Sequence, residues 1–133
     1  MSPTGRTADA GWQAGARRTF PVGEREAWEL LVSPQGQELW LGAAIDLSAG
    51  GEYALPDGTR GELRAASDRH LRLTWEAPGW SGESTVQVRV LPARSGATIA
   101  FHHERLADEA ERERALARWR GVLDALGERL AST

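Results

Sequence analysis

The C-terminal segment constrains the fold most, because its apolar residues recur at spacings of three and four from Asp108 onwards. That spacing places them on one side of an α-helix. They are Leu116, Trp119, Leu123, Leu126 and Leu130. Asp108 with Glu111 three positions later is typical of a helix N-terminus. The sequence therefore predicts one long amphipathic helix whose apolar stripe must be covered by other elements.

The charged residues of this segment mix both signs at short spacing, so we expect them to form a solvated surface. They are Glu109, Glu111, Arg112, Glu113, Arg114, Arg118 and Arg120.

The rest of the chain favours one strand, two short helices and then a run of antiparallel strands. Apolar and polar residues alternate in several short stretches separated by turn residues, and this period of two is typical of strands with one buried face. Pro34 divides the helical stretch into two. The expected strands are 13–20, 52–55, 60–65, 71–75, 86–90 and 99–103, and the expected helices are 24–32 and 34–41.

These elements predict the α+β class, with a curved antiparallel sheet wrapped around the long C-terminal helix and the two short helices following the first strand. We expect residues 1–11 to be a disordered leader and residues 12–133 to form a single domain. A helix that touches only the middle of a concave sheet leaves space beside it. That space is the candidate ligand cavity.

Composition excludes several function classes. The 133 residues include no cysteine and no lysine, which rules out disulfides, thiolate metal sites, Schiff-base chemistry and a lysine-containing phosphate loop. The formal net charge of -3 argues against a nucleic-acid partner. No stretch is long and apolar enough for membrane insertion. We therefore expect a cytoplasmic protein with neither a metal nor a cofactor.

Several short motifs, in their order and spacing, resemble the START-like helix-grip superfamily, also called SRPBCC. They are Arg18, Thr19, Phe20, Pro21, Ala27, Trp28, Pro34, Leu39, Trp40, Gly50, Gly51 and Tyr53. Two later runs, residues 102–106 and 118–126, resemble bacterial homologues of the activator of heat-shock protein 90 ATPase. The resemblance covers nearly the whole chain and implies a helix-grip fold.

Three functions follow from that resemblance. The first is binding of an apolar or aromatic, lipid- or polyketide-like small molecule between the sheet and the C-terminal helix. The second is a polyketide cyclase or dehydratase, and the third is modulation of a chaperone ATPase. The eukaryotic co-chaperone domain acts beside a second domain and uses basic surface, whereas this chain is acidic, which disfavours a chaperone partner. The sequence does not decide between a monomer and a homodimer.

Large aromatic residues are the main candidates to line the cavity. The chain contains six tryptophans, and we expect Trp75 from the sheet and Trp119 from the terminal helix to face the interior. The alternative is ordinary core packing, since large aromatic residues dominate many cores. The predicted apolar lining is Trp40, Trp75, Phe101, Trp119 and Leu123.

Arg18 and His103 are the polar candidates for the same site. Arg18 shares the face of Phe20, so its guanidinium could hold a carboxylate or phenolate, or else form an ion pair within the protein. His103 shares the face of Phe101 and could act as a polar pocket group or general acid–base, or only bond its neighbours. His102 and His103 should point to opposite faces of a strand and so cannot chelate one metal ion together.

Overall fold

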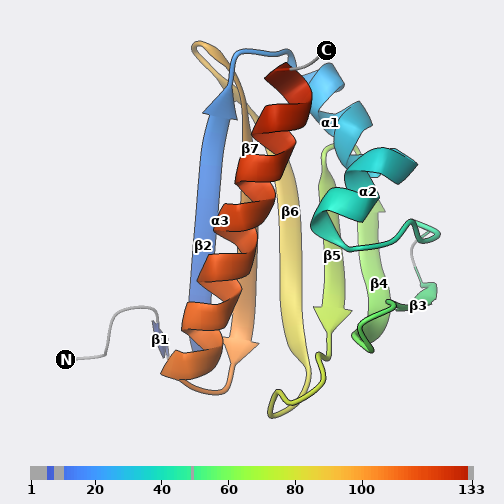
Figure 1. Ribbon diagram of the computed structural model, residues 1–133, viewed down its shortest axis with the longest axis vertical. Coiled ribbons are helices and arrows are strands. Elements are labelled where there is room, and N and C mark those ends of the chain that lie inside the picture. The colour runs from blue at the N-terminus through green and yellow to red at the C-terminus, as the bar shows by residue number, and fades with distance from the viewer. Residues whose placement is uncertain (1–5, 8–10, 49, 132–133) are drawn as a thin grey trace.

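The computed structural model describes residues 6–7, 11–48 and 50–131 of the chain. Apart from the two-residue strand β1, which was not predicted, its helices and strands follow the predicted order (Figure 1). The strands are β1 (Arg6–Thr7), β2 (Gly11–Phe20), β3 (Glu52–Ala54), β4 (Arg60–Ser67), β5 (His70–Trp75), β6 (Ser84–Ala93) and β7 (Gly96–Leu106). The helices are α1 (Glu24–Val32), α2 (Pro34–Trp40) and α3 (Glu109–Ala131).

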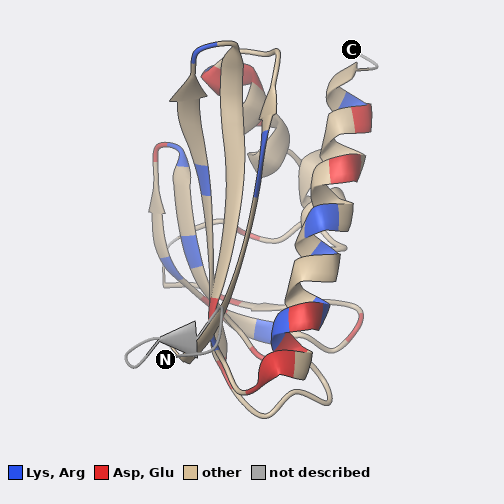
Figure 2. Ribbon diagram, turned by 90° about the vertical axis from the view of Figure 1, so that its left-hand side faces the viewer, with Lys and Arg blue, Asp and Glu red and all other residues tan. Residues whose placement is uncertain are grey.

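The strands form one seven-stranded sheet in the order β1-β2-β7-β6-β5-β4-β3, and every neighbouring pair is antiparallel. The long helix α3 lies across one face of this sheet, above β2 and β7, and α1 and α2 cover the same face beside it (Figure 1). Seen from the side, α3 is a separate layer with charged positions along its length (Figure 2). The predicted α+β, helix-grip class is therefore confirmed.

The predicted bounds agree closely with the observed elements. The first helix matches at both ends, whereas β6 and β7 extend further than expected because they pair with each other almost to the turn between them. Asp108 caps α3 as predicted, its Oδ1 accepting the amide of Glu111 at 2.8 Å. Most of the predicted leader lies outside the described residues. Within that stretch, Arg6–Thr7 pairs with the beginning of β2.

The core lies between the sheet and the helices, and the period of two decides which strand residues enter it. Inward positions in neighbouring strands face each other, as with Val86 and His103 or Val88 and Phe101. The buried inward residues include Ala14, Phe20, Tyr53, Leu63, Leu71, Leu73, Trp75, Ser84, Val86, Val88, Val90, Ala97, Ile99, Phe101 and His103. The opposite face is polar. Within the described part of the chain, no helix combines the length and apolar character needed to cross a bilayer.

One prediction about α3 is wrong. Glu111 and Arg118 do not belong to a solvated surface: Glu111 is only 3% exposed and Arg118 is half-buried. Both lie at helical spacing from buried Ala115, which makes the inward stripe of α3 wider than its leucines and tryptophan alone indicate. Two charged groups therefore reach the interior.

Candidate functional site

Five of the predicted site residues meet in the interior, and we call them the interior cluster. They are Trp40, Trp75, Phe101, His103 and Trp119. Trp119 lies at the centre: its ring stacks on Phe101 at 4.7 Å and meets Trp75 edge-on at 5.6 Å. Trp40 comes from the end of α2 and approaches Phe101 at 6.0 Å. Two helices and two strands far apart in the sequence, α2, β5, β7 and α3, thus contribute rings to one place.

The interior cluster is packed ring against ring. Trp40 and Trp119 have no exposed surface, and Trp75 and Phe101 have almost none. Leu123 is also buried, one turn along α3 from Trp119. The four hollows that the structure describes are lined mainly by other residues. The space expected between the sheet and α3 is filled by packed rings at this place, so a ligand could reach them only by displacing a side chain or segment that covers them.

Arg18 is not part of the interior cluster. Its guanidinium binds Asp124 of α3 at 2.6 Å, and the two side chains are 41% and 67% exposed. The alternation does turn Arg18 toward the helix side of the sheet, but β2 lies at the margin of that layer, where a carboxylate of α3 is within reach. The interpretation as a ligand clamp is corrected to an ion pair at the edge of the sheet.

His103 is fully buried and both of its ring nitrogens are occupied. Trp119 Nε1 donates to His103 Nδ1 at 3.2 Å, and His103 Nε2 lies 2.7 Å from Ser84 Oγ. The Ser84 hydroxyl donates onward to the carbonyl of Trp75. Only a neutral imidazole with its proton on Nε2 satisfies all of these hydrogen bonds. Burial, followed by the charge of Arg118, lowers the pKa of His103 to about 3.

Trp80 covers this histidine from the loop between β5 and β6. Its ring is stacked on His103 at 5.6 Å with an interplanar angle of 20°, and Arg114 lies 5.6 Å above the indole. Glu111 of α3 holds the loop in place, since its Oε2 accepts the amide of Ser81 at 2.8 Å and its Oε1 accepts that of Ala107. The 77–83 segment therefore covers His103, and the buried Glu111 carboxylate ties it to α3.

Replacing Glu111 with glutamine should release this cover. A glutamine side chain would set one NH₂ group against a backbone N–H donor, and leaving a buried donor unpaired costs about 1–3 kcal/mol. We expect faster hydrogen exchange at the Ser81 amide and a red shift of tryptophan emission. Glu113→Gln is the matched control, because Glu113 is 64% exposed and its loss should change stability by less than about 0.5 kcal/mol. Equal exchange at Ser81 in both variants would contradict the anchoring role.

Arg118 is a candidate site residue that the sequence pattern did not indicate. Its guanidinium lies 4.8 Å from the Trp75 ring centre and 5.2 Å from that of Trp119, and it donates to the carbonyl of Trp40 at 3.0 Å. Its Nε is buried without a hydrogen-bond partner. Among the described residues no carboxylate lies within 4 Å of it. Burial lowers the pKa of Arg118, opposed by the more distant Asp57 and Tyr53.

Tyr53 is a second polar group on this side of the interior. Its hydroxyl donates to the carbonyl of Thr74, and burial raises the pKa of the phenol well above its usual range. The phenol therefore stays neutral. Together with Arg118 and the His103–Ser84 pair, it gives an aromatic interior a few fixed polar groups, the composition typical of small-molecule sites.

Metal-binding clusters are not found in the part of the chain that the structure describes: no three His, Asp or Glu residues converge there. His102 and His103 point to opposite faces of β7, as the alternation predicts, with His102 bonded to Gln13 on the outer face at 2.7 Å. The polar groups that the described residues place in the interior are Arg118, Tyr53 and the His103–Ser84 pair.

Solved structures share this architecture. CalU16 from Micromonospora echinospora superposes with a TM-score of 0.76 at 25% identity, over 92% of this chain and 80% of its own. DynU16, a protein in the dynemicin biosynthetic locus, gives 0.76 at 17% identity over 90% of this chain. This chain spans only 47% of DynU16. An HSP90 activator from Plasmodium falciparum gives 0.60 at 19% identity, over 72% of this chain and 74% of its own.

No curated protein is similar enough in sequence to count as a relative. A family model does match, over residues 22–131, which include the two short helices, β3 to β7 and the whole of α3. Because this match covers most of the chain and all of the interior cluster, the protein belongs to the family described as activator of Hsp90 ATPase homolog 1-like protein.

Proposed function

We propose that the protein binds a small apolar or aromatic molecule between the sheet and α3, at the interior cluster, and that the ligand carries an anionic or acceptor group. The main support for the proposal is that the Arg118 guanidinium has no carboxylate partner among the described residues. A cation removed from water is normally paired with a carboxylate. The half-buried guanidinium of Arg118 instead faces indole rings and one carbonyl. A carboxylate, phenolate or carbonyl oxygen of a ligand would supply the missing partner.

Entry of the ligand requires movement of the 77–83 segment. Trp80 covers His103 by one ring stack, and its loop is held to α3 by the Glu111 carboxylate. Loops of this kind belong to the least stable parts of a fold. Displacing Trp80 would open a path to Trp119 and Trp75, and the aromatic ring of the ligand would take the place of the indole.

Binding is tested with 2-naphthoate and naphthalene, followed by quenching of tryptophan emission. We expect saturable binding of 2-naphthoate that Arg118→Met weakens by about tenfold, the value of one charge-assisted hydrogen bond. Naphthalene should bind both proteins equally. The control is Arg120→Met, because Arg120 is an exposed arginine on the same helix. An absence of saturable binding, or equal weakening by Arg118→Met and Arg120→Met, would refute the proposal.

The two other functions have less support. A cyclase or dehydratase needs Arg18 or His103 to reach its substrate, but Arg18 is paired with Asp124 and both nitrogens of His103 are bonded. Modulation of a chaperone ATPase stays a prediction. An ATPase assay with a bacterial Hsp90, with and without this protein, tests it directly.

A further inference from the structure

A hollow of about 520 Å³ lies on the outer face of the sheet, on the side away from α3. Strands β2, β7 and β6 form it. Most of its lining residues face outward, and Phe101 is the one residue that it shares with the interior cluster. Its floor contains Gly15, Ala100 and Leu91, and its sides carry Arg17 and Arg89.

The strand register explains why a hollow forms here. Arg17 pairs with Ala100, and Ala100 pairs on its other side with Arg89, so the three residues form one row across the sheet. Neighbouring strands are about 4.8 Å apart, which puts the two arginine backbones about 10 Å from each other. Ala100 between them is only a methyl group, and Gly15 beside it has no side chain. Both guanidinium groups can therefore converge on one ligand above Ala100.

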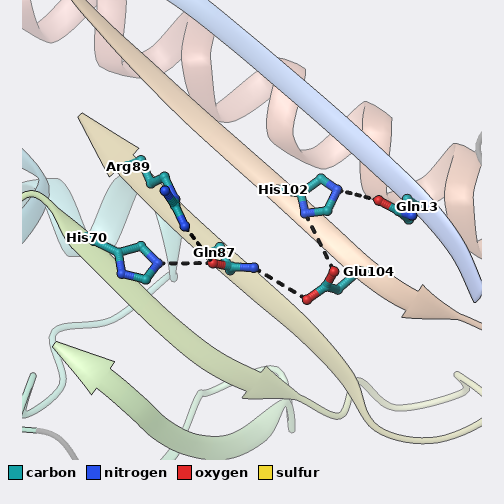
Figure 3. A network of polar contacts seen from close by, with 6 residues as sticks. All are labelled: Gln13, His70, Gln87, Arg89, His102 and Glu104. Atoms are coloured by element: carbon teal, nitrogen blue, oxygen red, sulfur yellow. Dashed lines mark hydrogen bonds and ion pairs between the residues drawn. The ribbon is translucent and has the colours of Figure 1, made fainter. Parts of the chain in front are cut away.

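The two arginines keep their positive charge available. Within the described chain, neither Arg17 nor Arg89 has a carboxylate within 4 Å, and no acidic residue lines the hollow. Glu104 lies on the same face but is engaged elsewhere, with Gln87 at 3.4 Å and His102 at 3.9 Å (Figure 3). Gln87 stands between Glu104 and Arg89, and its Oε1 accepts from both His70 and Arg89.

The other described hollows do not share this balance of charge. One outer hollow contains four glutamates and a single arginine, and another combines three arginines with Glu83. The hollow beside α1 and α2 contains Asp46 and Asp68 and no arginine. Of the four, only the hollow between Arg17 and Arg89 offers cationic groups without an acid in its lining.

We propose that this outer hollow binds a small phosphate ester. Arg17 and Arg89 hold the phosphate oxygens, since guanidinium groups match phosphate in charge and in the geometry of paired hydrogen bonds. Two arginines balance a phosphate dianion. Gly15, Ala100 and Leu91 provide a surface for the uncharged part of the ester, and Gln87 positions Arg89 at the rim.

Titration with n-butyl phosphate and with inorganic phosphate, at constant ionic strength and followed by NMR of the backbone amides, tests the proposal. We expect saturable shifts centred on Gly15, Ala100 and Arg89, with the ester binding more tightly than inorganic phosphate. Arg17→Gln and Arg89→Gln should each weaken binding about tenfold. Two controls should leave it within twofold: Arg25→Gln, an exposed arginine of α1, and Arg72→Gln, which lines the neighbouring hollow.

Ala100→Glu provides an independent test, because it places a carboxylate between the two arginines. We expect this variant to remain folded, with unchanged melting temperature or a higher one, and to lose phosphate binding. The proposal is overturned if the ester does not bind saturably or binds no better than inorganic phosphate. It is also overturned if Arg72→Gln weakens binding as much as Arg17→Gln, or if Ala100→Glu binds like the wild type. None of these outcomes depends on Arg118 or the interior cluster.

Discussion

Replacing Trp119 with alanine is expected to lower the free energy of unfolding by about 3–5 kcal/mol, the usual cost of truncating a buried large aromatic residue. Trp119 has no exposed surface, stacks on Phe101 at 4.7 Å and contacts Trp75 at 5.6 Å. Its indole N–H also donates a hydrogen bond to His103 Nδ1. Truncation would remove these contacts together and leave a void next to an unpaired ring nitrogen. Urea denaturation followed by far-ultraviolet circular dichroism measures the loss.

Trp119→Phe separates packing from hydrogen bonding. Phenylalanine keeps a ring stacked on Phe101 but removes the donor to His103, so we expect a smaller loss of about 1–3 kcal/mol. Trp28→Ala is the second control, since Trp28 only packs against the outside of the core. If Trp119→Ala lowered the free energy of unfolding no more than Trp28→Ala does, the interior cluster would not be the main source of stability in the core.

The second large effect concerns pH. His103 has a folded-state pKa of about 3, below its ordinary value of 6.5, because it is buried and faces Arg118. Between these two values the unfolded chain binds a proton that the folded chain does not. The stabilisation from neutral His103 is therefore complete above pH 6.5 and is lost as the pH falls toward 3. The expected loss is about 1.4 kcal/mol for each pH unit in that window.

Comparison with His103→Gln isolates this contribution from that of the carboxylates. Glutamine can accept from Trp119 and donate to Ser84, but it does not titrate. We expect the variant to be less stable than the wild type at pH 7, and the difference to shrink toward pH 4. Denaturation curves at several pH values measure it. A difference that stays constant over this range would contradict a neutral, buried His103.

Local patterns were sufficient to predict the elements of the fold except the two-residue strand β1. The helical spacing from Leu116 to Leu130 and the proline at position 34 gave α1, α2 and α3, and alternation gave the strands. The lengths of β6 and β7 could not be predicted in the same way. They depend on pairing between the two strands, which continues through Pro92 and Ala97 beyond the alternating stretch.

The candidate site was predictable only in part, because burial and charge compete along α3. The apolar periodicity predicted that Trp75, Phe101, His103 and Trp119 face the interior, and the structure shows their rings in contact. Arg118 and Glu111 were assigned to the solvent by their charge, although both lie at helical spacing from Ala115. Their partners are a tryptophan carbonyl and loop amides, and contacts of that kind leave no pattern in the sequence. Arg18 was placed on the correct face, but its partner Asp124 could not be identified in advance.

The most direct test of a ligand site under Trp80 is an NMR measurement of intermolecular NOEs between 2-naphthoate and the isotope-labelled protein. We expect NOEs from the naphthalene protons to Trp75, Trp119 and the side chain of Arg118, with loss of the contact between Trp80 and His103. NOEs only to the outer face of the sheet, or a Trp80–His103 contact that persists at saturating ligand, would contradict it.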